Sequence, residues 1–273
     1  MTRREVAARA VACTRNQRTK GEHSVFVSSS SNDLQRVVIL NPKGGCGKTT
    51  LATNLASYYA MHEPLPALLD CDPQGASTQW HEKRARNRPP IHAIAAYKKT
   101  MNATRSWQRR VPQETRRMII DTPAALEGPE IHDAIYDASN ILIPVMPSAI
   151  DIRFATRFIA ELLLIAQLDR GAIKVGIVAN RTRNNTRSLQ KLMRFLASLR
   201  IPVVGMLRDS QNYVTAADHG IGVYELPDYR ADKDKADLST IIGWLDRWNA
   251  PRGEQLPKMA IPEVSAGLAQ QHQ

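Results

Sequence analysis

The sequence predicts an α/β fold, a three-layer arrangement in which helices cover both faces of a parallel sheet. Two observations predict it. Short β-rich runs alternate with helical patterns along the chain, as in proteins built from β-α-β units. A glycine-rich turn follows the first of these runs and opens a helix. The β-rich runs are RVVIL, PALLD, RMIID, NILIPV, IKVGIVAN and IPVVGM.

Length and charge narrow the possible functions. The chain has 273 residues, enough for one large α/β domain with extended ends. Lys and Arg exceed Asp and Glu by 37 to 26, and a net charge of +11 favours a polyanionic partner. No apolar run approaches the roughly 18 residues that span a bilayer. Cys13, Cys46 and Cys71 show no metal or disulfide spacing, which suits a reducing cytoplasm.

Three segments follow from composition. Residues 1–33 are basic and serine-rich without apolar periodicity, and we expect a disordered basic arm. Residues 34–249 carry the alternating pattern and form the expected domain. Residues 250–273 are rich in Pro and Gln and are expected to be a flexible tail.

One helix is clearly marked after the run NILIPV. Ser148 is a candidate N-cap, and Asp151 three residues later resembles a capping box. The helix should bury one apolar face. That face contains Ala155, Phe158, Ile159, Leu162 and Ile165 or Ala166.

The run KGGCGKTT has the spacing of a phosphate-binding loop. Its glycines let successive backbone N–H groups point at phosphate oxygens, and the following helix directs its positive end at the same anion. Lys48 is expected to neutralise the β- and γ-phosphates, and the Thr49 hydroxyl to bind Mg²⁺. A nucleotide would be held by Gly44, Gly45, Cys46, Gly47, Lys48, Thr49 and Thr50.

Three acidic residues follow two of the predicted strands. Asp70 and Asp72 end the run ALLDCD, and Asp121 ends RMIID. Each alone is also compatible with a helix cap or a turn. After a phosphate-binding loop, Asp121 fits an acid that holds the metal of a nucleoside triphosphate.

These motifs resemble a known family. The pattern KGGCGKT, followed by DCDPQG and IIDTP, resembles the deviant-Walker P-loop ATPases of the ParA/MinD superfamily. The resemblance covers about residues 36–248 and is strongest to short ParA-type partition ATPases (ParF-like), with carboxysome-positioning McdA proteins similar too. It implies ATP and Mg²⁺ as cofactors and a homodimer that forms with ATP.

The resemblance also assigns roles to individual residues. Lys43 would reach across the dimer to the partner's ATP, where the alternative is a solvated loop lysine. Asp72 would position the attacking water, and Asp70 would support the metal shell. Asp151 falls near the dimer interface, although helix capping explains it equally well.

Two strand ends are expected near the adenine base. Asn180 lies where relatives place a base contact, although a turn role fits this residue as well. Arg208 lies where many relatives have Pro-Arg. Leu207 replaces that proline and departs from the pattern.

A basic stripe is predicted on one helix, opposite Leu189, Leu192, Met193, Leu196 and Leu199. The residues of the stripe are Arg183, Arg187, Lys191 and Arg194. A solvated helix face is the simpler reading. Since ParA relatives bind nucleoid DNA without sequence preference, the resemblance favours phosphate contacts. Gln211 departs from relatives that have a DNA-contacting arginine there. Other basic clusters occur at Arg105–Arg117 and at Arg230–Lys235.

The resulting hypothesis is a cytoplasmic, nucleoid-associated ATPase. It would dimerise on ATP, bind nonspecific DNA and be released by hydrolysis that a small ParB-like or McdB-like adaptor stimulates. A plasmid or chromosomal locus is the first cargo expected, and a carboxysome or other protein assembly the second. A MinD-like membrane switch would need a basic amphipathic C-terminal helix, and the proline-rich tail argues against one. An iron–sulfur reductase would need further cysteines after Cys71.

Overall fold

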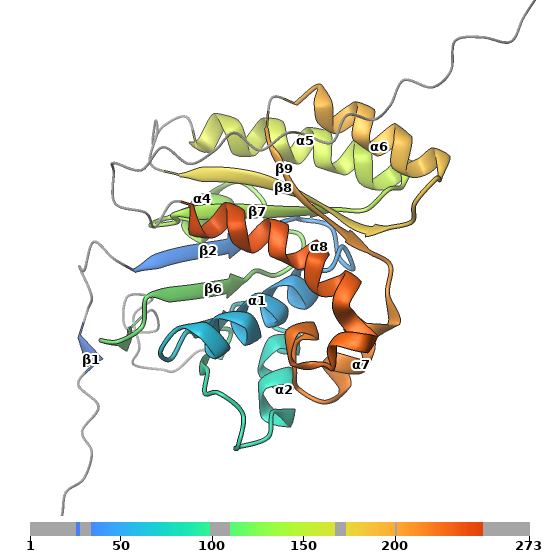
Figure 1. Cartoon of the computed structure of the whole chain (residues 1–273). Helices are drawn as coiled ribbons and strands as arrows, with labels where there is room; N and C mark the ends of the chain where they lie inside the picture. Colours follow the sequence, from blue (N-terminus) through green and yellow to red (C-terminus); the bar gives the residue numbers. More distant parts are fainter. Residues whose placement is uncertain (1–25, 28–33, 99–109, 167–172, 200, 248–273) are drawn as a thin grey trace, which may run out of the picture.

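A seven-stranded parallel sheet forms the centre of the molecule (Figure 1). The computed structural model describes residues 26–27, 34–98, 110–166, 173–199 and 201–247. Its strands lie in the order β4-β3-β6-β2-β7-β8-β9. Their bounds are β2 Gln35–Ile39, β3 Ala67–Asp70, β4 His92–Ala95, β6 Arg117–Asp121, β7 Asn140–Val145, β8 Lys174–Thr182 and β9 Val203–Arg208.

Six of these strands are the six β-rich runs, so the predicted parallel sheet is confirmed. The seventh, β4, was not predicted, because its four half-buried residues give only a short apolar signal. It lies at the edge of the sheet, where it pairs with β3 alone.

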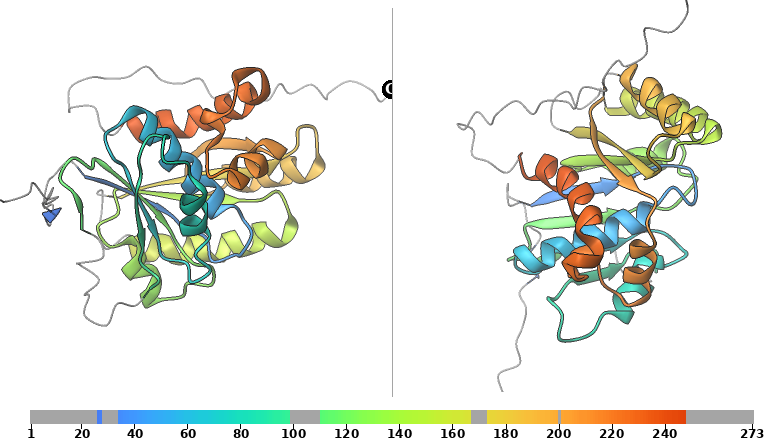
Figure 2. Two further views of the ribbon diagram at one scale, coloured as in Figure 1. Left: turned by 90° about the horizontal axis from the view of Figure 1, so that it is seen from below. Right: turned by 45° about the vertical axis from the view of Figure 1, so that its right-hand side comes forward.

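Helices cover both faces of the sheet, as the sequence predicts (Figure 2). Alternate residues of β2 point to opposite sides: Val37 and Ile39 enter one apolar core, and Val38 enters the other. The first core packs α1 Lys48–His62, α2 Ala76–Lys83, α7 Gln211–Asp218 and α8 Asp228–Asp246, together with the short 3₁₀ helix η2 Val223–Glu225. The second packs α4 Pro129–Ile135, α5 Ala149–Ala166 and α6 Arg187–Ala197.

The predicted start of α5 is confirmed. The backbone N–H of Asp151 donates to Ser148 Oγ, and the Ser148 hydroxyl donates back to the Asp151 carboxylate. Ser148 therefore caps the helix, and the Asp151 carboxylate holds the capping hydroxyl in place. The expected apolar residues from Ala155 to Leu162 are buried in the second core.

The predicted tail, residues 250–273, and all of the predicted arm except residues 26–27 lie outside the described residues. Within the arm, β1 Phe26–Val27 pairs antiparallel with β5 Val111–Pro112. Cys46 is buried and Cys71 half-buried, and both are free thiols. In the described part of the chain, no helix is long and apolar enough to cross a membrane.

Arg117 does not belong to the exposed basic cluster that was predicted at Arg105–Arg117. Its side chain is buried, donates to Glu63 at 2.8 Å and to Asp246 at 3.1 Å, and lies over the ring of Tyr59. Paired carboxylates offset the cost of burying this charge, so Arg117 holds the amino end of β6 and does not face a DNA backbone. Residues 105–109 of that cluster, including Trp107, lie outside the described part.

Candidate nucleotide site

The carboxyl ends of β2, β3 and β6 bring the predicted motifs together. In the sheet β6 lies between β2 and β3, and Asp121 is in register with both Ile39 and Asp70. The loop after β2 therefore lies beside the two strands that end in acidic residues. Such an edge of a parallel sheet is where α/β proteins bind nucleotides.

The loop from Lys43 to Gly47 has the backbone that its glycines predict. Gly45 and Gly47 have φ of +73° and +96°, a region that side chains disfavour. A Cβ at Gly47 would also lie 2.1 Å from Nδ2 of Asn180. Gly47 then leads directly into α1, whose first N–H groups face the loop.

The Lys48 side chain spans the loop from inside. Its exposed fraction is 6%, and its Nζ donates to the carbonyl oxygens of Asn41 at 2.9 Å and Lys43 at 3.3 Å. The ammonium group is therefore fixed within the curl that would receive phosphate oxygens. This placement fits the countercharge role that the sequence predicts.

Thr49 and Asp121, the two residues predicted to hold Mg²⁺, are in contact. The Thr49 hydroxyl donates to Asp121 Oδ2 at 2.8 Å, and the Ser77 hydroxyl donates to the same oxygen. Burial raises the pKa of Asp121 to about 6, although these two hydrogen bonds lower it. The other oxygen, Oδ1, is buried without a hydrogen-bond partner among the described residues. A hydroxyl beside an unsatisfied carboxylate oxygen is a donor set that fits Mg²⁺.

Asp70 and Asp72 take different positions after β3. Asp70 is buried and accepts hydrogen bonds from the backbone and hydroxyl of Thr78 through Oδ2. Its Oδ1 accepts from the backbone N–H of Asp72. Asp72 is half-buried, with Oδ1 accepting from the N–H of Gln74. Asp70 thus fixes the turn that presents Asp72.

The Lys43 side chain reaches the first turn of α5. Its Nζ lies 2.5 Å from Oδ1 of Asp151, whose side chain is 4% exposed. The sequence predicted both residues but not their contact. Two further residues of the site were missed. Asn41 accepts the Lys43 N–H and donates to Pro144 O, and Ser77 contacts Asp121. Asn41 could have been predicted, because a polar residue stands directly between the first strand and the glycine-rich loop.

Asn180 supports the phosphate-binding loop. Its Nδ2 donates to the carbonyl oxygen of Cys46 at 2.7 Å, and its Oδ1 accepts from the N–H of Arg181. The side chain is 6% exposed. Both ends of the amide are therefore engaged by the protein, and a contact with the base remains a prediction.

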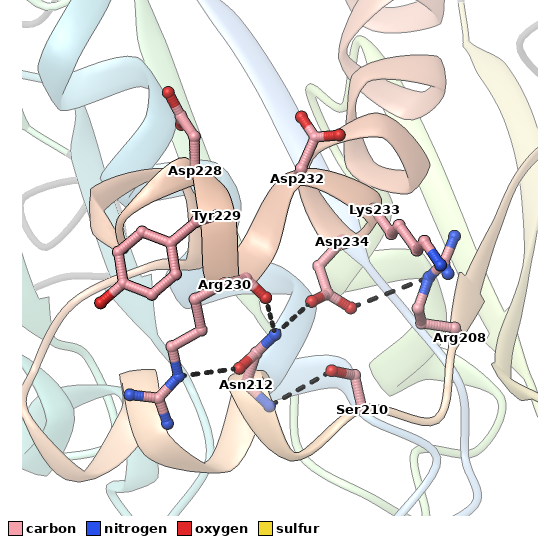
Figure 3. A pocket seen from close by; sticks show the side chains of 9 residues that line it. All are labelled: Arg208, Ser210, Asn212, Asp228, Tyr229, Arg230, Asp232, Lys233 and Asp234. Carbon is pink, nitrogen blue, oxygen red and sulfur yellow. Dashed lines mark hydrogen bonds and ion pairs between the residues drawn. The ribbon is translucent and has the colours of Figure 1, made fainter.

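Arg208 lies at the end of β9 and turns toward α8. Its guanidinium makes two hydrogen bonds of 2.7 Å with Asp237. It lines a pocket of about 680 Å³ with residues of α7 and α8, among them the buried Asp234 (Figure 3). Of the third predicted basic cluster, Arg230 and Lys233 line this pocket together with Asp228, Asp232 and Asp234, whereas Lys235 pairs with Asp228. A base contact by Arg208 likewise remains a prediction.

The predicted basic stripe needs one correction. Arg187, Lys191 and Arg194 are exposed on α6, opposite the buried Leu192 and Leu196. Arg183 is not on this helix, because Thr186 caps α6 and Asn185 has a left-handed φ of +59°. Arg183 instead forms an exposed ion pair with Asp209 at 2.7 Å.

A phosphate-binding loop with an internal lysine, a hydroxyl–carboxylate pair and a half-buried acid defines a P-loop nucleotide-binding protein. The family described as CobQ/CobB/MinD/ParA nucleotide binding domain (CbiA) matches residues 37–223. The chain belongs to this family of ParA/MinD-like ATPase domains.

Two curated relatives are both called maintenance of carboxysome distribution protein A. The protein from Halothiobacillus neapolitanus is 27% identical over 201 residues, which are 72% of this chain and 90% of the relative. The protein from Gloeobacter kilaueensis is 27% identical over 231 residues, which are 80% of this chain and 97% of the relative. The structure of a putative plasmid partition protein from Borrelia burgdorferi bound to AMPPNP superposes with a TM-score of 0.58. It is 13% identical and covers 77% of this chain and 99% of that chain, so it supports the fold alone.

Proposed function

We propose that this chain is an ATPase that dimerises on ATP, binds DNA without sequence preference as the dimer, and is released when ATP is hydrolysed. The observation that carries the proposal is the pair of lysines on one loop. Lys48 is buried within the loop, whereas Lys43 is 27% exposed and is held at its rim by Asp151. A second cation at the rim supports the proposal, because a lysine there would meet phosphates that another protomer holds.

The residues of the site divide the chemistry between them. Lys48 and the loop N–H groups bind the triphosphate, and Thr49 with Asp121 would hold Mg²⁺. Bound Mg²⁺ supplies charge neutralisation of the phosphate oxygens. Asp72 has one oxygen fixed by Gln74 N–H, and Oδ2 takes no hydrogen bond among the described residues. That oxygen is available to accept a proton from water and orient it toward the γ-phosphate.

DNA binding is proposed for the exposed cations of α6, with Arg183 beside them. Arg187, Lys191 and Arg194 lie on one helix and have no ion-pair partner in the described part of the chain. Unpaired cations on a helix face suit a phosphate backbone, whose recognition needs charge and no base reader. A dimer would present this surface twice and gain affinity by effective concentration.

For the cargo, the two relatives favour a protein assembly over a DNA locus. Both are named for carboxysome distribution, and each aligns with at least 72% of this chain. We therefore propose that the ATPase positions a carboxysome-like assembly on the nucleoid through a small adaptor. DNA partition is the second candidate and is supported by the shared fold of the plasmid partition protein.

One experiment tests the core of the proposal. The chain is mixed with DNA and with ATP, ADP or no nucleotide, and its mass and DNA binding are measured by light scattering and co-sedimentation. We expect a dimer that sediments with DNA only in ATP. Equal DNA binding under all three conditions would contradict nucleotide control. A tagged chain that follows carboxysomes in a cell, and not a plasmid, would decide the cargo.

A further inference from the structure

The direction of the bound nucleotide follows from the sheet order. Asp121 ends β6 and Asp72 follows β3, so the metal and the γ-phosphate belong on the β3–β6 side of the loop. β7 and β8 lie on the opposite side of β2. A nucleoside triphosphate is an extended molecule, and its base must lie at the end away from the γ-phosphate. The base therefore extends toward the carboxyl end of β8.

At the carboxyl end of β8, Arg181 has an unusual backbone conformation. Its φ is +50°, which is uncommon for a residue with a Cβ. The pairing with β9 also shifts at this point: Ala179 is opposite Met206 and Thr182 opposite Arg208, so two residues of β8 face one of β9. Bulges of this kind redirect side chains and are frequent beside functional sites.

The strained backbone is held in place by the phosphate-binding loop. Asn180 donates to Cys46 O with one end of its amide and accepts the N–H of Arg181 with the other. The neighbouring Thr182 is fixed through its carbonyl oxygen, which accepts from the N–H of Asp209. Arg181 is therefore tied to the loop that binds the phosphates, and these contacts hold a backbone conformation that would otherwise be unfavourable.

The Arg181 side chain is exposed and has no hydrogen bond or ion pair in the described part of the chain. The next arginine, Arg183, is paired with Asp209. A guanidinium is planar, stays charged and stacks on aromatic rings. We infer that Arg181 binds the base of the nucleotide by stacking its guanidinium on the ring. This inference rests on the proposed ATP binding and adds a base contact that neither Asn180 nor Arg208 shows in the structure.

The test compares ATP with inorganic tripolyphosphate, which keeps the phosphates and lacks the base and ribose. We expect Arg181→Ala to weaken ATP binding about tenfold, the loss of one desolvated cation–π contact. Tripolyphosphate binding should be unchanged. Titration calorimetry with Mg²⁺ present measures both. Unchanged ATP affinity would overturn the inference, and so would an equal loss for tripolyphosphate, which would mark a phosphate contact.

Two further variants separate a lost contact from a damaged fold. Arg181→Gly relieves the left-handed backbone, so it should lose ATP affinity like the alanine variant while unfolding no earlier than wild type. Arg181→Lys keeps the charge without the plane and should lie between wild type and alanine. Arg116→Ala removes an exposed arginine just before the amino end of β6, at the end of the strands away from the phosphate-binding loop. This variant should bind ATP normally. If the wild type itself fails to bind ATP, the proposed function fails and not the role of Arg181 alone.

Discussion

Lys43 and Asp151 join the phosphate-binding loop to the first turn of α5, with Nζ and Oδ1 2.5 Å apart. The carboxylate is 4% exposed and is also bound by the Ser148 hydroxyl, so it cannot follow the lysine. A Lys43 side chain that contacts a partner's phosphates must leave Asp151. On the role proposed for Lys43, the pair would therefore oppose dimerisation until phosphates replace the carboxylate.

This contact predicts opposite effects on dimerisation for variants of its two residues. Lys43→Ala should bind ATP yet dimerise poorly, because the contact across the dimer is lost. Asp151→Asn should dimerise at several-fold lower ATP concentration, since it releases the lysine and its amide oxygen still accepts from the Ser148 hydroxyl. Light scattering against ATP concentration measures both. A wild-type curve for Lys43→Ala would make Lys43 an ordinary loop lysine.

Lys48→Ala should abolish ATP binding, with a loss of about 100-fold or more. The buried ammonium is the countercharge inside the loop, and its hydrogen bonds to the Asn41 and Lys43 carbonyl oxygens hold the empty loop together. Binding of a fluorescent ATP analogue measures the effect. Circular dichroism of the same sample checks the fold, and wild-type affinity in a folded variant would contradict the role.

Asp72→Ala should retain ATP binding and lose hydrolysis, which would trap a DNA-bound dimer. The expected role of Asp72 is to orient water, and removing it leaves the phosphate contacts of the loop intact. Phosphate release and DNA co-sedimentation are measured together. Normal turnover would exclude Asp72 from the mechanism.

The exposed cations of α6 predict a salt-dependent interaction with DNA. Replacing Arg187 and Lys191 together with Glu should weaken binding about equally on every DNA sequence and flatten its dependence on salt. Basal ATP hydrolysis should persist, because these side chains face away from the buried side of α6. Lys83→Glu with Arg86→Glu changes the net charge equally at an exposed site elsewhere and serves as the control. If the two double variants bind DNA alike, the DNA surface lies outside α6.

Glu225 predicts a pH-dependent contribution to stability. Burial raises the pKa of its carboxyl, but hydrogen bonds from Arg84 and Ser57 lower it by more, so the pKa lies below its usual range. A depressed pKa stabilises the fold above the unfolded value of 4.5 and the effect is lost as the pH falls through the folded value. At pH 7 Glu225→Gln should cost about 3–5 kcal/mol, because Arg84 would be left buried without its partner.

Urea denaturation of the wild type and Glu225→Gln at pH 7 and at acidic pH checks this. The difference between their free energies of unfolding should shrink as the wild-type carboxyl is protonated. Glu82→Gln, at an exposed position on α2, is the control for removing a carboxylate. A difference that does not change with pH would show that the ion pair is not its source.

The sequence by itself determined the alternation of strands and helices, the phosphate-binding loop, and the acids after β3 and β6. These features are local: glycine backbone freedom, apolar periodicity and a carboxylate at a strand end are all readable within a few residues. Only the tertiary structure decided which distant groups meet. The contacts of Lys43 with Asp151, of Asn180 with Cys46 and of Arg117 with Glu63 join residues 54 to 134 positions apart. Such pairings depend on strand order and helix packing, which bring together side chains that no local pattern relates.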